Sequence, residues 1–200
     1  MNIYVETNFI LELTFEQEQN KACEKILELS QTNQINLILP AYSLAEPHEK
    51  LTRQANSRRE LQRLLNNELG QLSRSLSYTD RIKSIKDIAK LIIQSNQEEW
   101  QRFNQYRDRL IDCAEFIPLN IHILQAAISF ETLYSLKSQD AIVFASVISH
   151  LDHNKPDQAC FLNKNSKDFD SPDIVLELNN WNCRMIPRFD HGFNFIQSQL

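Results

Sequence analysis

Four acidic side chains lie where a chain of alternating strands and helices would bring distant segments together. Glu6 ends the first apolar strand, and Glu46 lies on the helix after the second strand. Asp140 is in the first turn of a later helix, and Asp168 follows a strand near residue 160. Hard cations such as Mg²⁺ prefer carboxylate oxygens, and carboxylates gathered in one cleft repel each other unless a cation is bound. The four residues are therefore candidate metal ligands.

Each of these positions also has an explanation that needs no ligand. A Glu at a strand end is commonly solvated, and Glu46 beside Pro47 can face water. Asp140 in a first turn is favoured by the helix dipole, and Asp168 can cap the helix that starts near Pro172. The order and local context of the four acids, rather than any one of them, favour a shared site.

The segments around these acids predict an α/β fold. Strands are expected at residues 2–6, 35–39, 116–119, 158–163 and 183–186, with helices between them. This alternation favours a mostly parallel central sheet of about four or five strands, flanked by helices on both faces. Such sheets bind ligands beyond the carboxyl ends of their strands, which is where the acids are placed.

Helix boundaries are predicted from capping residues and from proline. We expect Thr7 or Asn8 to cap the first helix and Ser138 to cap a later one. A second helix is expected from Glu16 to about Gln31. Pro47 should kink or split the helix that begins near residue 41, because proline lacks a backbone donor and clashes with the preceding turn.

A long helical stretch interrupts the alternation. From about residue 54 to residue 114, apolar residues recur at three- and four-residue spacing. This pattern predicts a helical hairpin inserted into a single domain that spans residues 1–200. Trp100, Phe103 and Tyr106 on its second helix could stack on bases, but packing between the two helices is the favoured interpretation.

Composition excludes several kinds of site. The chain has two glycines, Gly70 and Gly192, whereas phosphate-binding loops, dinucleotide-binding turns and nucleophile elbows each need closely spaced glycines. The net charge of −5 argues against binding nucleic acid through overall positive charge, but it leaves room for a local basic strip. The four cysteines are dispersed without a C-x-x-C pair, and we expect them to be isolated buried thiols of a reducing compartment.

The chain shows no membrane or export signal. No apolar run approaches the about 20 residues that span a bilayer. The N-terminus has no basic region followed by an apolar stretch, so it does not resemble a signal peptide. We therefore expect a cytoplasmic protein without a membrane partner.

Four segments, in this order, resemble the motifs of PIN domains. Ile3–Ile10 is a strand that ends in an acid-Thr-Asn triplet, and Leu39–Glu46 is a strand followed by a helix with a Glu. Ser138–Ala145 opens a buried helix with Asp-Ala, and Phe161–Phe169 is a strand followed by a polar loop and Asp-Phe. The resemblance covers nearly the whole chain apart from the hairpin.

The resemblance implies a PIN-like fold and the hydrolysis of phosphodiester bonds, most commonly in RNA, with Mg²⁺ or Mn²⁺ as the cofactor. The metal would lower the pKa of a bound water and polarise the phosphate. Asn8 would orient Glu6. The implied metal ligands, of which the four acids are also the catalytic residues, are Glu6, Glu46, Asp140, Asn165 and Asp168.

Basic residues near the acidic motifs are candidate substrate contacts. Arg53 follows the motif with Glu46, and Lys164 and Lys167 lie within the fourth motif. Basic groups at the rim of an acidic pocket would offset its repulsion of the phosphate backbone, although a solvated helix face explains Arg53 equally well. The nearby pair His150 and His153 lies at a helix C-terminus, where the dipole explains histidine better than a metal does.

Two departures from the family pattern motivate competing hypotheses. The first acid of the family is typically Asp, whereas this chain has Glu6, and an acid often stands where Asn165 is found. The favoured hypothesis is an active metal-dependent ribonuclease, as in the toxins of bacterial toxin–antitoxin pairs. The alternatives are a catalytically degenerate PIN scaffold that binds RNA or a protein, and an unrelated α/β interaction module. An antitoxin or other protein partner and a homodimer are further expectations that the sequence leaves open.

Overall fold

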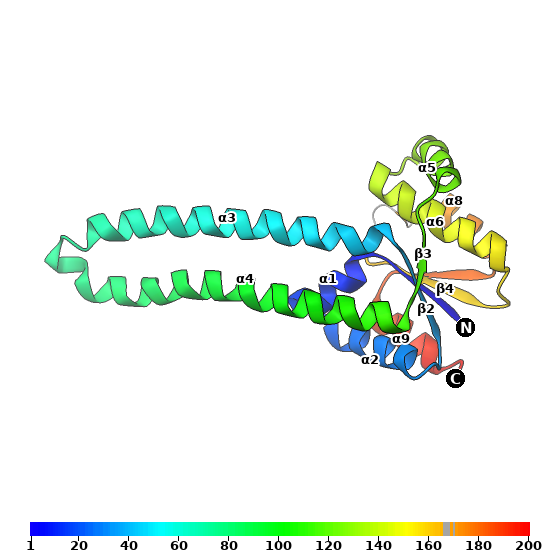
Figure 1. Ribbon diagram of the computed structural model, residues 1–200, viewed down its shortest axis with the longest axis horizontal. Helices are drawn as coiled ribbons and strands as arrows, with labels where there is room; N and C mark the ends of the chain where they lie inside the picture. Colours follow the sequence, from blue (N-terminus) through cyan, green and yellow to red (C-terminus); the bar gives the residue numbers. More distant parts are fainter. Residues whose placement is uncertain (166–168, 170) are drawn as a thin grey trace.

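The computed structural model describes residues 1–165, 169 and 171–200, and its centre is a parallel β-sheet (Figure 1). The strands of the described chain are β1 (Asn2–Val5), β2 (Asn36–Pro40), β3 (Glu115–Ile117), β4 (Ala159–Leu162) and β5 (Cys183–Ile186). Their order is β3-β2-β1-β4-β5, and every neighbouring pair is parallel. The predicted α/β fold is thus confirmed, and β1 lies at the centre of the sheet.

Helices cover both faces of this sheet (Figure 1). Because side chains alternate along a strand, Ile3 and Val5 face one layer and Tyr4 faces the other. The first layer contains α1 (Thr7–Phe15), α2 (Asn20–Gln31), α9 (Phe189–Gln197) and part of the hairpin. The second contains α5 (Ile121–Leu133), α6 (Ser138–Asn154) and α8 (Pro172–Asn180). The strands are therefore buried on both sides, as parallel strands usually are.

The predicted hairpin consists of two long antiparallel helices, α3 (Tyr42–Leu72) and α4 (Thr79–Cys113), joined through the 3₁₀ turn Leu76–Tyr78 (Figure 1). Its base belongs to the core, where His48 of α3 packs edge-on against Trp100 and the buried Phe103 of α4, at ring-centroid distances of 5.0 and 6.5 Å. The favoured interpretation of these aromatic residues is therefore confirmed. In the described part of the chain, neither these helices nor any other is apolar enough over a sufficient length to cross a membrane.

The helix N-caps predicted from the sequence lie one or two residues after the N-caps in the structure. Glu6 caps α1 by accepting a hydrogen bond from the backbone N–H of Asn8, so Thr7 is the first helical residue. Ser138 is likewise the first residue of α6, and the cap position is Lys137, which makes no side-chain capping bond. Glutamate is an uncommon cap, and this explains why the sequence pattern favoured the neighbouring Thr and Asn.

Other boundaries also differ from the prediction. Glu16 adopts a left-handed backbone conformation, with φ of 50°, which ends α1 and delays α2 until Asn20. Pro47 does not split α3, because the packing of the buried side chains Leu51 and Ala55 supports the helix beyond it. The C-terminal helix α9 was not predicted. The four cysteines are free, with three of them buried and Cys113 half-buried.

Candidate active site

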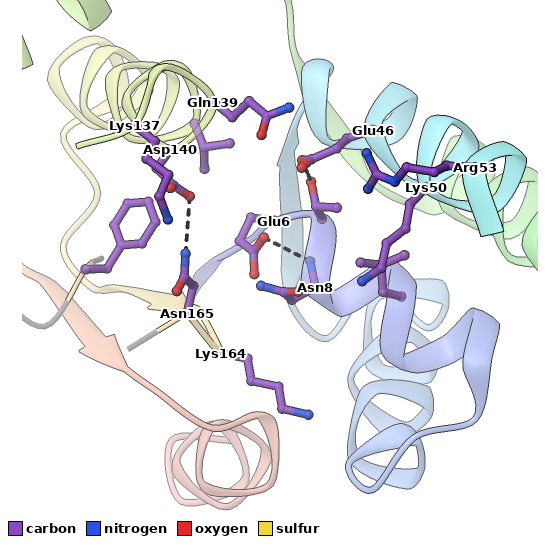
Figure 2. Close-up of a pocket in the computed structure, with 14 residues that line it drawn as sticks. Glu6, Asn8, Glu46, Lys50, Arg53, Lys137, Gln139, Asp140, Lys164 and Asn165 are labelled. Carbon is purple, nitrogen blue, oxygen red and sulfur yellow. Dashed lines mark hydrogen bonds between the residues drawn. The ribbon is translucent and has the colours of Figure 1, made fainter. Parts of the chain in front are cut away.

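A cavity of about 480 Å³ opens at the carboxyl ends of the strands (Figure 2). Three of the predicted acids, Glu6, Glu46 and Asp140, line it together with Asn165. They come from the end of β1, from α3, from the first turn of α6 and from the segment after β4. They converge because the parallel strands all end at the same edge of the sheet.

Glu6 is the buried acid of this cavity, with 6% of its surface exposed. Its Oε2 accepts the hydrogen bond from the backbone N of Asn8 at 2.9 Å, whereas its Oε1 is buried and has no hydrogen-bond partner in the described part of the chain. The pKa of Glu6 is raised to about 8: burial is the largest cause, the charges of Glu46 and Asp140 add to it, and the hydrogen bonds from Asn8 partly offset it. A cation beside Glu6 would relieve this unfavourable charge.

Glu46 is held at the cavity by Thr7. The Thr7 hydroxyl donates a hydrogen bond of 2.5 Å to Oε2 of Glu46 (Figure 2). Thr7 is the first residue of α1, and Glu46 lies in the second turn of α3, so this bond ties the two helix starts together. Sequence reasoning placed Thr7 in the first motif but gave it no role in the site.

Asp140 and Asn165 are neighbours on one wall of the cavity. The Nδ2 of Asn165 donates to Oδ1 of Asp140 over a long 3.4 Å (Figure 2). The backbone N of Asn165 donates to Oδ1 of the buried Asn163 at 2.7 Å, which shapes the chain just after β4. Asp168 and Lys167, the other predicted site residues of this segment, lie outside the described residues.

The donor set matches a hard divalent cation in chemical type. It consists of carboxylate oxygens and one amide oxygen, and the unpartnered Oε1 of Glu6 marks an oxygen that still lacks a positive neighbour. Over residues 1–165, 169 and 171–200, however, no three His, Cys, Asp or Glu side chains form a group that could hold a metal ion. The three acids thus surround the cavity rather than form a closed cage.

Basic side chains line the same cavity. They include the predicted Arg53, and also Lys50 and Lys137, which sequence reasoning missed (Figure 2). Lys50 and Arg53 follow Glu46 by four and seven residues, so all three lie on one face of α3. That spacing was visible in the sequence and could have identified Lys50. Lys137 gave no comparable signal beyond its place before the third motif.

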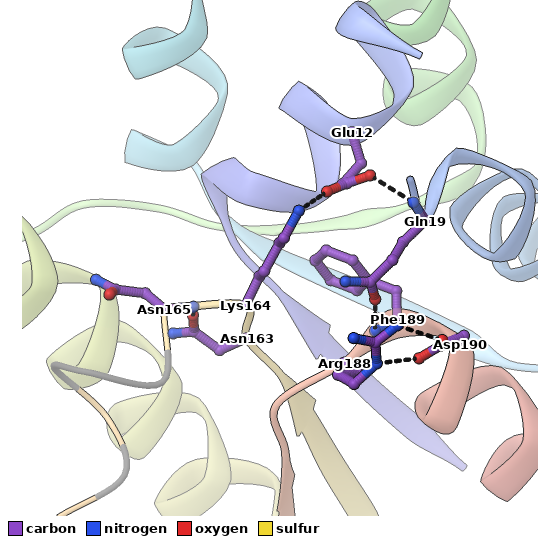
Figure 3. A network of polar contacts seen from close by, with 8 residues as sticks. All are labelled: Glu12, Gln19, Asn163, Lys164, Asn165, Arg188, Phe189 and Asp190. Atoms are coloured by element: carbon purple, nitrogen blue, oxygen red, sulfur yellow. Dashed lines mark hydrogen bonds and ion pairs between the residues drawn. The ribbon is translucent and has the colours of Figure 1, made fainter. Parts of the chain in front are cut away.

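Lys164 lines the cavity, but its ammonium group is paired with Glu12 (Figure 3). Glu12 is fully buried on α1, and its second carboxylate oxygen accepts from the backbone N of Gln19 at 2.9 Å. The side-chain oxygen of Gln19 in turn accepts from the backbone N of Phe189 at 2.6 Å. This network ties the segment after β4 to α1 and α9, and it was not expected from the sequence.

His150 has structural partners. Its ring nitrogens contact the Tyr4 hydroxyl at 2.8 Å and the Glu115 carboxylate at 3.0 Å, which joins α6 to β1 and β3. His153 is exposed on the same helix. These contacts account for His150 without a metal.

One of three comparisons with known proteins gives a match. A family model described as "PIN domain" matches residues 3–169, which takes in the cavity and the whole hairpin. No curated protein and no solved structure matches the chain.

Proposed function

The chain belongs to the PIN-domain family, a family of nuclease type, and from this premise we propose that it is a divalent-metal-dependent ribonuclease that hydrolyses phosphodiester bonds. The observation that carries the proposal is the convergence of Glu6, Glu46 and Asp140 on one cavity at the ends of the parallel strands. Mg²⁺ or Mn²⁺ bound there would lower the pKa of a bound water and polarise the phosphate.

In this proposal, each acid has a supporting partner in the chain. Glu6 offers its unpartnered Oε1 while the backbone of Asn8 holds the other oxygen. Thr7 positions Glu46 by donating to one of its carboxylate oxygens. Such supporting hydrogen bonds fix the orientation of metal ligands and raise their affinity.

Asp140 and Asn165 lie on the opposite side of the cavity from Glu46 (Figure 2). Asp140 is positioned by the amide of Asn165. Asn165, with Asp168 of the same segment, would hold a second ion or its waters.

The cations at the cavity suit a phosphate substrate. Three acids alone would repel a polyanion, and Lys50, Arg53 and Lys137 bring positive charge to the same walls. We propose that these groups contact the phosphates on either side of the bond that is cut. Lys164 has a different role, because Glu12 holds its ammonium group.

Cleavage of RNA by the purified protein with Mn²⁺ tests the proposal. We expect cleavage that a chelator stops and that Asp140→Asn abolishes. Asp152→Asn is a matched control, because Asp152 is exposed on the same helix and away from the cavity. Equal activity of wild type and Asp140→Asn would rule the proposed site out.

A catalytically degenerate PIN scaffold is the second candidate. It is favoured by the absence, within the described residues, of a group of three acids close enough to hold a metal ion, and by the neutral Asn165. In that case calorimetry would show RNA binding that depends on Arg53, while RNA stays intact with Mg²⁺ and with Mn²⁺.

The finer proposal is a cytoplasmic toxin that is neutralised by an antitoxin. Its support is the family alone, since many PIN domains have this role. Induced expression in a bacterial host should arrest growth, and Asp140→Asn should not. Growth arrest by both wild type and Asp140→Asn would show that the toxicity does not depend on the proposed nuclease site.

A further inference from the structure

A second cavity, of about 530 Å³, lies between the two helices of the hairpin, near the middle of α3 and of α4. Its lining residues recur at three- and four-residue spacing, so each helix contributes one stripe of side chains. The volume falls within the roughly 300–1,000 Å³ that is usual for small-molecule sites. We define the hairpin cavity by six of its lining residues, Ala55, Arg59, Gln62, Asn96, Gln97 and Trp100.

The hairpin cavity is separate from the candidate active site. Arg59 follows Glu46 on α3 by about 20 Å along the helix axis and by roughly 140° around it, at about 1.5 Å and 100° per residue. No described residue lines both cavities. A ligand of the hairpin cavity is therefore recognised by a different set of side chains.

Amide side chains supply hydrogen-bonding groups to this cavity. Asn96 is oriented by Arg58, whose guanidinium donates to Oδ1 of Asn96 at 2.7 Å and pairs with the buried Glu99 at 2.7 Å. Because Arg58 already donates to that oxygen, the Nδ2 of Asn96 is the group left to donate to a ligand. Gln62 and Gln97 add two further amides, each with donor and acceptor atoms. A ligand with donors and acceptors along one edge can satisfy all three.

The hairpin cavity also contains an aromatic ring and a cation. Trp100 is half-buried and is held by edge-on contacts with His48 and Phe103, at ring-centroid distances of 5.0 and 5.9 Å. Arg59 is exposed, forms no ion pair within the described part of the chain, and makes one long hydrogen bond of 3.4 Å to Asn56. Among the described residues, no acid lines the hairpin cavity, so its charge is positive.

We propose that the hairpin cavity binds a nucleotide. The base stacks on Trp100, as bases do on aromatic side chains in nucleic-acid-binding proteins. The three amides form hydrogen bonds with the edge of the base, and Arg59 contacts the phosphate. A free mononucleotide and a nucleotide within an RNA strand present this same chemistry. The inference does not depend on the proposed nuclease activity.

Other classes of ligand match only part of the lining. A metal ion finds no carboxylate among the described lining residues. An apolar molecule would bury the amides without hydrogen-bond partners, which costs free energy. A neutral sugar would satisfy the amides but not the charge of Arg59. A nucleotide matches the ring, the amides and the cation together.

Tryptophan fluorescence tests the proposal with the full chain. The chain has two tryptophans, so Trp181→Phe leaves Trp100 as the only one. This protein is titrated, with a chelator present to prevent cleavage, with each 5′-ribonucleoside monophosphate and with a single-stranded RNA oligonucleotide. We expect saturable quenching of Trp100, with a dissociation constant below about 1 mM for at least one of these probes.

Variants of the lining separate the contributions of the phosphate and the base. Arg59→Met should raise the dissociation constant of the bound probe at least about tenfold, because a charge-assisted hydrogen bond is lost. Gln62→Leu combined with Gln97→Leu should change the order of affinity among the bases. Arg63→Met is the matched control, because Arg63 is exposed on α3, pairs with Glu60 and lies outside the cavity lining. Circular dichroism checks that every variant is folded.

The two kinds of probe identify the source of the nucleotide. Equal affinity for a monophosphate and the oligonucleotide indicates a free nucleotide, whereas a preference for the oligonucleotide indicates a nucleotide within a strand. Three results would overturn the proposal: no quenching by any probe at about 1 mM, an Arg59→Met protein that binds as wild type does, and an order of base affinity that the glutamine substitutions leave unchanged. An inactive nuclease would alter none of these outcomes.

Discussion

The ammonium group of Lys164 is paired with the carboxylate of Glu12, a side chain that is fully buried between α1 and the segment after β4. Because Glu12 also accepts from the backbone of Gln19, its charge is satisfied only while both partners are present. This pair anchors the segment that carries Asn165. We propose that Lys164 serves the cavity by holding its wall, because Glu12 already pairs with its ammonium group.

Replacing Lys164 with Met should destabilise the protein by roughly 3 kcal/mol, because it leaves Glu12 buried without its counter-charge. The free energy of unfolding from urea titration measures this effect. Lys155→Met, at an exposed position, should change it by less than about 0.5 kcal/mol. A Lys164→Met protein of wild-type stability with weakened RNA binding would show that Lys164 is a substrate contact instead.

Lys50→Met combined with Arg53→Met should weaken RNA binding and leave stability nearly unchanged, because both side chains lie at the cavity wall. Measured in an Asp140→Asn background to prevent cleavage, the slope of log affinity against log salt should fall by about 1.4 for two lost contacts with single-stranded RNA. Lys21→Met with Lys155→Met is the control. An unchanged slope would mean that phosphates do not contact this wall.

The raised pKa of Glu6 makes the metal-free protein sensitive to pH. Its folded pKa is about 8 against an ordinary value of 4.5, so the folded state binds this proton more tightly than the unfolded state does. Stability should therefore decrease as pH rises from about 4.5 to about 8 and then level off. Thermal melts with a chelator should show this decrease for wild type.

Glu6→Gln should remove the part of the decrease that comes from Glu6, because glutamine does not titrate, and Glu28→Gln at an exposed position should retain it. A saturating divalent metal should also flatten the wild-type curve if the ion binds beside Glu6. Identical pH dependence in wild type and Glu6→Gln would show that the Glu6 carboxyl has an ordinary pKa.

The sequence predicted the sheet well because each strand is short, mostly apolar and closed by a polar residue or a proline. The cavity followed from that topology, and Glu6, Glu46 and Asp140 all line it. Helix starts were harder to predict, because Glu6 caps α1 where Thr and Asn are the usual caps.

Long-range polar contacts could not be predicted from sequence. Nothing in the spacing of Glu12 and Lys164, 152 residues apart, indicates that they pair. The same holds for the bond between Thr7 and Glu46, which depends on how two helices meet. Local patterns record which face of an element is buried, but they do not record which distant polar group satisfies a buried charge.

Asn165→Asp should strengthen metal binding. Asn165 contacts Asp140 at the wall of the cavity, and a carboxylate there would add a charged oxygen donor where the chain now offers a neutral amide. We expect the Mn²⁺ dissociation constant from calorimetry to fall about tenfold or more, equivalent to about 1.4 kcal/mol.

The metal-free variant should be less stable than wild type, because two carboxylates would then face each other. The gain in melting temperature on adding Mn²⁺ should be larger for the variant, since stabilisation by a ligand increases with the logarithm of its affinity. Asn179→Asp, exposed on α8, should change neither quantity. A variant with wild-type Mn²⁺ affinity would place the metal away from Asn165.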